Sequence, residues 1–126
     1  MTSTMTEISD RFFAAATAQD LDALRALYAE DARIWHNWDD HEQDVEENLT
    51  SLGGIPQRYD SFGYDGVRTV ELPDGFLRQH DILAERGGRS VRVPAILRGY
   101  VSDDRITRIE EYFDLGQLAP VRGVEA

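Results

Sequence analysis

The sequence contains no cysteine, which excludes thiol nucleophiles, disulfide bonds and thiolate metal sites. Positive charge is also scarce, because Lys and Arg together number 13 against 24 for Asp and Glu and leave a formal net charge of -11. A chain with this charge repels the phosphate backbone of nucleic acids. We therefore expect no nucleic-acid partner.

Long hydrophobic runs are missing as well. No apolar stretch approaches the roughly 18 residues of a membrane span, and the N-terminus lacks the basic-then-apolar pattern of a secretory signal. We therefore expect a cytoplasmic protein with no membrane partner. No repeat and no linker rich in Ser, Gly or Pro divides the chain, so residues 1–126 are expected to form a single domain.

Hydrophobic periodicity predicts three helices in the first half of the chain. The first helix begins at Thr4 and Glu7, which have the spacing of a capping box. The second follows Asp20, a good N-cap, and includes Tyr28 in its apolar stripe. The third begins in the acidic segment 42–47, which suits the positive end of a helix dipole.

Strand patterns fill the remainder of the chain. One strand is expected over residues 32–37, between the second and third helices, and four more are expected over residues 57–72, 76–84, 90–101 and 105–113. Gly63, Gly66 and Gly99 fall inside these patterns and indicate bulges or bends. The order predicts an α+β fold in which three helices cover a strongly curved, cone-shaped, mostly antiparallel sheet with an internal pocket.

Two segments carry a family resemblance, residues 27–32 before the first strand and residues 106–114 at the last strand. Over nearly its whole length the chain resembles the nuclear transport factor 2-like superfamily. Within it, the chain is similar to the branch of ketosteroid isomerases, SnoaL-like polyketide cyclases and limonene epoxide hydrolases. The resemblance implies a cystatin-like roll and a homodimer formed through the sheet.

The first strand holds the first group of candidate residues. His36 lies where ketosteroid isomerases have a proton-transferring Asp, and Trp35-His36-Asn37 resembles the Tyr-His-Asn segment that holds water in limonene epoxide hydrolases. The resemblance thus makes His36 and Asn37 candidate catalytic residues and Trp35 a candidate substrate contact. Alternation places Ile34 and His36 on one strand face and Trp35 and Asn37 on the other. Which face lines the pocket stays open.

The third strand holds the second group. Gln79-His80-Asp81 corresponds to the Arg-x-Asp pair of limonene epoxide hydrolases, with the Asp retained. Asp81 interrupts an apolar strand, where burial would raise its pKa and suit it as a general acid. The alternative is an ion pair with Arg78, Arg92 or Arg98. Gln79 and His80 are candidate substrate contacts, and by alternation His80 takes the face opposite to Asp81.

The last strand provides Glu111, the strongest acid/base candidate. It shares an apolar face with Ile109 and Phe113, and it stands where limonene epoxide hydrolases have a general-base Asp. Tyr112 beside it is a candidate substrate contact. The alternative for Glu111 is an ion pair with Arg98 on the adjacent strand.

The sequence gives little support for a tyrosine oxyanion hole or for a metal site. The helix-one Tyr of the ketosteroid isomerase oxyanion hole falls near Phe12, which has no hydroxyl and is therefore only a candidate apolar contact. A metal site formed from residues 36–41 would match no standard spacing. We expect neither a metal nor a cofactor.

These candidates point to an enzyme with an apolar pocket and cofactor-independent acid/base chemistry of the isomerase, cyclase or epoxide hydrolase type. The expected substrate is a hydrophobic ketone, epoxide or polyketide-, terpenoid- or steroid-like molecule. Glu111 or His36 would remove a proton while Asp81 donates to the developing oxyanion. The alternative is a non-catalytic ligand-binding or dimerisation module of the same fold.

Overall fold

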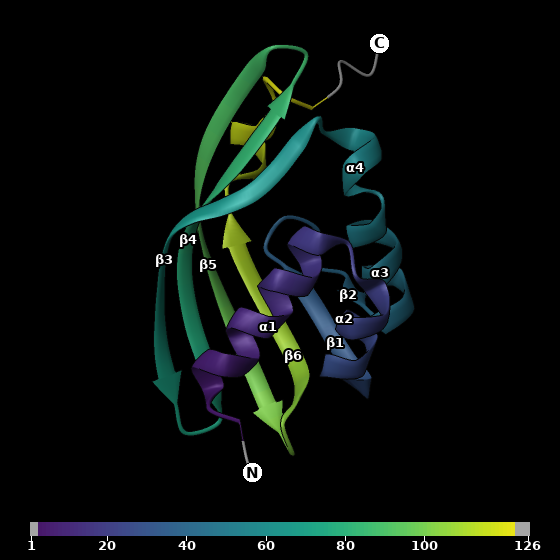
Figure 1. The fold of residues 1–126 in the computed structure, drawn as a ribbon, viewed down its shortest axis with the longest axis vertical. Helices are drawn as coiled ribbons and strands as arrows, with labels where there is room; N and C mark the ends of the chain where they lie inside the picture. The colour runs from purple at the N-terminus through teal and green to yellow at the C-terminus, as the bar shows by residue number, and fades with distance from the viewer. Residues whose placement is uncertain (1–2, 123–126) are drawn as a thin grey trace.

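Four helices lie on one side of a strongly curved sheet in the computed structural model, which describes residues 3–122 (Figure 1). The helices are α1 (Met5–Ala18), α2 (Leu21–Leu27), α3 (Val45–Gly53) and the short α4 (Ile55–Arg58). The strands are β1 (Tyr28–His36), β2 (Glu42–Gln43), β3 (Ser61–Leu72), β4 (Gly75–Arg86), β5 (Arg89–Ser102) and β6 (Arg105–Phe113), followed by a 3-10 turn, η1 (Leu115–Leu118). None of these helices is long and apolar enough to cross a membrane.

The six strands form one sheet in the order β2-β1-β6-β5-β4-β3. All neighbours are antiparallel except β1 and β6, which run parallel and join the first long strand of the chain to the last. The register of this pair sets Ile34 beside Ile109 and His36 beside Glu111. The α+β class and the mostly antiparallel curved sheet expected from the sequence are confirmed.

The helix starts follow local capping chemistry. Thr4 Oγ1 accepts from the Glu7 amide at 3.1 Å, and Glu7 Oε1 accepts from the Thr4 amide at 2.8 Å, which completes the predicted capping box. Asp20 caps α2, as expected. A second capping box at Asp44 and Glu47 begins α3. Side chains that satisfy free backbone N–H groups therefore fix where all three longer helices begin.

Two glycines act differently in the curved sheet. Gly66 has φ 62°, and the β3–β4 register shifts between Asp65 and Arg68, so this position is the expected bulge. Gly99 leaves room for a ring, because a Cβ there would lie 2.3 Å from the Phe76 ring. Gly63 does not form a bulge, since its pairing with β4 is regular.

The predicted boundaries fail at two places. Tyr28 begins β1 instead of closing the second helix, because its backbone is extended and its ring is buried against Phe12. Residues 57 and 58, expected in a strand, belong to α4, which has a proline in its first turn. The short β2 and η1 were not expected either. By contrast, β6 begins and ends where its alternation predicts.

Two hydrophobic clusters form the core. The larger joins the helices to β1, β5 and β6 and includes Ile8, Leu24, Tyr28, Ile34 and Ile106. The smaller lies beneath η1 and comprises Ile82, Ala84, Val93, Ala95, Leu118 and Val121. Several partly buried aromatic side chains pack against the smaller cluster without filling the space above it. That space is the cavity described next.

We expect Gly99→Ala to lower the free energy of unfolding by about 2 kcal/mol, because the added methyl group would overlap the Phe76 ring in a packed core. Urea denaturation measures the loss. Gly63→Ala is the matched control, since a Cβ at that position meets no atom within 4 Å. Equal stability of the two variants would contradict this explanation of Gly99.

Candidate active site

An inner cavity of about 360 Å³ lies between α3, α4 and the sheet face that the helices cover. Its walls are mostly apolar and come from Trp38, Leu52, Ile55, Tyr59, Phe62, Tyr64, Ile82, Phe113, Leu115 and Leu118. The polar groups His36, Gln43 and Glu111 also line it. A few polar groups within an apolar concavity are typical of a small-molecule site.

His36 and Glu111 meet in this cavity. His36 Nε2 lies 3.2 Å from Glu111 Oε1, and the two side chains are 13% and 16% exposed. The His36 ring stacks on Trp38 with ring centroids 4.5 Å apart, and Trp38 in turn contacts Phe113 at 4.8 Å. An imidazole and a carboxylate this close together can take part in acid/base chemistry on a bound molecule.

Two tyrosines lie close enough to Glu111 to respond to its charge. Burial raises the pKa of the Tyr28 hydroxyl, and the negative charge of Glu111 raises it further. The same two causes raise the pKa of Tyr64. Both phenols therefore stay protonated and act as hydrogen-bond donors at neutral pH. Within residues 3–122 the Tyr64 hydroxyl has no hydrogen-bond partner, so it can donate to a molecule in the cavity.

The Tyr28 hydroxyl is instead used within the protein. It donates to Asn48 Oδ1 at 2.6 Å, and Asn48 Nδ2 donates to Gln43 Oε1 at 3.1 Å. This chain of bonds directs the Gln43 carbonyl oxygen toward Asn48. The Gln43 amide nitrogen, which has no protein partner within residues 3–122, is then a second donor on the cavity wall.

Arg78 and His80 form a buried pair behind Tyr64. Both residues are 3% exposed, and Arg78 Nε donates to His80 Nδ1 at 2.7 Å. The Arg78 guanidinium lies 3.7 Å from the centre of the Phe13 ring. Desolvation, followed by the positive charge of Arg78, lowers the pKa of His80 to about 4. His80 is therefore a neutral ring that packs between Phe13 and Tyr64.

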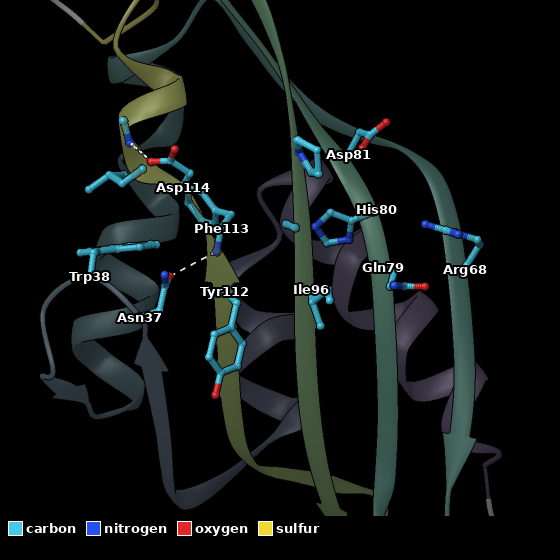
Figure 2. A pocket seen from close by; sticks show the side chains of 14 residues that line it. Asn37, Trp38, Arg68, Gln79, His80, Asp81, Ile96, Tyr112, Phe113 and Asp114 are labelled. Carbon is cyan, nitrogen blue, oxygen red and sulfur yellow. Dashed lines mark hydrogen bonds between the residues drawn. The ribbon is translucent and has the colours of Figure 1, made fainter.

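Several predicted site residues lie on the opposite, outer face of the sheet (Figure 2). Asp81 Oδ2 accepts from Arg92 Nη1 at 2.7 Å, and its side chain is 31% exposed. The ion pair considered for Asp81 is thus the one that forms. Gln79 and Tyr112 share this face, where they line an open groove of about 640 Å³. The structure does not bring these residues together with Glu111.

The remaining candidates also have defined places. Ile34 is buried and His36 shares its face, so this face of β1 is the one that lines the inner cavity. Trp35 lies on the outer face against Tyr112, with ring centroids 5.2 Å apart. Phe12 is a core residue, 4% exposed. Asn37 borders the outer groove, and its Oδ1 accepts from the Phe113 amide at 3.2 Å, as Figure 2 shows. It fixes the end of β6 next to Glu111.

Two further pairings have defined outcomes in the structure. Arg98 does not pair with Glu111, because it lies on the outer face and bonds Asp74 at 2.5 Å. His41 does not converge with His36, because its Nε2 lies 2.8 Å from Glu47. Within residues 3–122 no cluster of three or more His, Cys, Asp or Glu side chains forms a metal-ligand set.

The chain also has no lysine, so no side-chain amine can form an imine.

Sequence reasoning missed Tyr64 and Gln43. Tyr64 alternates with Phe62 along β3, and both line the cavity. That pattern could have identified the tyrosine. Gln43 lies in a strand of two residues, which is too short to show any periodicity.

Histidine 80 gives the fold a measurable pH dependence. The pKa of His80 is 6.5 in the unfolded chain and about 4 in the folded protein. Between these pH values the unfolded chain therefore binds a proton that the folded chain does not. Stability is therefore retained above pH 6.5 and lost as the pH falls toward 4. Relative to His80→Gln, we expect the wild type to lose about 2 kcal/mol more over this range. Denaturant unfolding measures the difference, and equal losses in both proteins would show that His80 is not desolvated.

Comparisons with known proteins agree with this architecture. A family model described as the SnoaL-like domain matches residues 9–109. A comparison with curated proteins gives no match. Among solved structures, a candidate polyketide cyclase from Pseudomonas putida KT2440 superimposes with a TM-score of 0.82 at 19% identity, covering 96% of this chain and 99% of that one.

Two more structures support the same fold. IdmH from Streptomyces antibioticus, itself a proposed polyketide cyclase, has a TM-score of 0.84 at 17% identity, with 94% of this chain and 97% of IdmH covered. An NTF2-like protein from Burkholderia xenovorans LB400 has a TM-score of 0.80 at 20% identity, with 98% of this chain and 100% of that protein covered. At these identities the likeness establishes the fold alone.

Proposed function

The chain belongs to the SnoaL-like domain family, and we propose that it is an enzyme that enolises a hydrophobic carbonyl compound in its inner cavity, leading to isomerisation or cyclisation. One observation carries the proposal. A carboxylate and an imidazole lie 3.2 Å apart in a mostly apolar cavity, each less than one-fifth exposed. Groups held in this way are suited to general acid/base catalysis.

Glu111 is the proposed base. His36 Nε2 lies 3.2 Å from one carboxylate oxygen, Oε1, and the other oxygen is left for substrate. That oxygen takes a proton from the carbon next to the carbonyl group. The electrons of the broken C–H bond form the carbon–carbon double bond of an enolate, and negative charge develops on the carbonyl oxygen.

Tyr64 is the proposed donor to that oxygen. Tyr64 lines the cavity and its hydroxyl stays protonated, so it can stabilise the enolate by a hydrogen bond within mostly apolar walls. In an isomerisation the protonated Glu111 returns the proton to a different carbon. In a cyclisation the enolate carbon attacks an electrophilic carbon of the same molecule.

Epoxide hydrolysis fits the cavity less well. In that reaction a proton donor must reach the epoxide oxygen, and the candidate for this role was Asp81. The structure places Asp81 on the outer face, bonded to Arg92. Enolisation requires no group from that face.

The direct test is exchange of the α-hydrogens of apolar ketones in D₂O, followed by NMR with β-tetralone and related ketones. We expect the wild type to accelerate exchange and Glu111→Gln to reduce the rate by about 10²- to 10³-fold, because the amide keeps the shape but is not a base. Glu110→Gln is the control, since Glu110 bonds Tyr100 and Arg108 on the outer face. Undiminished exchange by Glu111→Gln would remove Glu111 from the mechanism.

For assembly, we propose that two copies of the chain meet through the outer sheet face. Large apolar side chains are exposed there, including Ile96 at 38% and Tyr112 at 46%. Both border the outer groove. Apolar exposure of this kind on a sheet is typical of an interface. The same contact would be the main function if the chain were a non-catalytic dimerisation module.

Sedimentation tests this assembly. At micromolar concentration we expect the wild type to sediment as a dimer and Tyr112→Glu as a monomer, because the new charge would be buried in the interface. Val67→Glu provides the control, since Val67 is 44% exposed but lies in a shallow depression beside α1. A monomeric wild type, or a dimer that survives Tyr112→Glu, would refute the proposed interface.

A further inference from the structure

Three arginines line the inner cavity and are exposed, which places them at its mouth: Arg58, Arg86 and Arg122. They come from three different elements, the end of α4, the end of β4 and the segment after η1. The lining contains two carboxylates, Glu111 and Asp39, and Glu111 faces His36. The lining thus has one more arginine than carboxylates, in a chain whose net charge is -11.

None of the three mouth arginines forms an ion pair within residues 3–122. The arginines that do so are Arg25, Arg92, Arg98 and Arg108. The carboxylates next to the mouth are otherwise engaged, because Asp60 accepts from the Gly87 amide at 2.8 Å and Glu85 accepts from the Ser61 hydroxyl at 3.1 Å. Among residues 3–122 of so acidic a protein, three guanidinium groups without an ion pair lie at one opening and can bind an external anion.

Two of these guanidinium groups are held in place by the backbone. Arg58 Nη2 donates to the Ser51 carbonyl oxygen at 2.9 Å, and Arg86 Nη1 donates to the Arg58 carbonyl oxygen at 3.1 Å. Each bond uses one of five N–H donors and leaves the others free. Less side-chain entropy is lost on binding when the donors are already positioned.

The cavity is therefore amphipathic along its depth. Its mouth carries guanidinium groups, its walls are apolar, and the Glu111–His36 pair lies within. Guanidinium binds carboxylates through two parallel hydrogen bonds. Arginines outnumber carboxylates in the lining by only one, and Asp39 at the same opening disfavours a dianion, so a monocarboxylate fits better than a phosphate monoester.

We propose that Arg58 and Arg86, assisted by Arg122, form a carboxylate subsite, and that the substrate is an apolar keto acid. The carboxylate binds at the mouth and the apolar body fills the cavity, which carries the carbonyl group inward toward Glu111. What happens to that carbonyl group rests on the function proposed above. The binding of the carboxylate does not.

Calorimetric titration with two unreactive ligands of the same shape tests the subsite. Naphthylacetate carries the carboxylate, and naphthylacetamide is its neutral counterpart. At low ionic strength we expect the wild type to bind the carboxylate about tenfold more tightly than the amide. In Arg58→Gln/Arg86→Gln we expect this preference to fall to about twofold or less, with the affinity for the amide unchanged.

The control variant is Arg33→Gln/Arg105→Gln, which removes the same charge from two exposed residues that do not line the cavity. It should keep the full preference for the carboxylate. The inference is overturned if the wild type does not bind naphthylacetate, if it binds both ligands equally, or if both double variants show the same preference. Circular dichroism of each variant confirms that it is folded.

The outcome is separable from that of the proposed enolisation. A wild type that binds naphthylacetate and naphthylacetamide equally, beside an intact Glu111 effect on ketone exchange, would reject the subsite alone. A preserved preference beside undiminished exchange by Glu111→Gln would reject the enolisation alone.

Discussion

The parallel pairing of β1 with β6 is the constraint on which the site depends. It joins two strands that are far apart in the sequence and fixes the register that sets His36 beside Glu111. Strand alternation then turns both side chains to the face that also carries Ile34 and Ile109. A shift by one residue would send the pair to the outer face, so the buried isoleucines protect the register of the site.

The cavity exists because the helices and the curved sheet do not close completely over this pair. α3 and α4 supply one wall, and aromatic residues from β3 and β6 supply another. Burial of two phenols near Glu111 keeps both protonated. The Tyr28 hydroxyl orients Asn48, while the Tyr64 hydroxyl has no hydrogen-bond partner in the described part of the chain. The same environment that disfavours charge therefore provides both a base and a neutral donor.

The sequence predicts the last strand and the orientation of Glu111 well, because Ile109 and Phe113 share the side of Glu111 while Arg108 and Glu110 lie on the other. The β4 pattern is ambiguous by contrast. Its buried face carries Arg78 and His80, while Leu77 and Leu83 lie half-buried on the other face with Asp81. Because apolar residues lie on both faces of β4, alternation does not indicate which face is buried. Only the packed structure shows that Asp81 points outward. The mouth arginines come from three separate elements, so no local pattern could unite them.

The central claim is that the cavity, and not the larger outer groove, is where a carbonyl substrate reacts. A crystal structure with β-naphthol, a stable mimic of an enol with an apolar body, tests this most directly. The account predicts the naphthol oxygen within hydrogen-bonding distance of Glu111 or Tyr64, with its rings between Phe62 and Phe113. Naphthol bound only in the outer groove beside Tyr112, or absent from the cavity at saturating concentration, would contradict it.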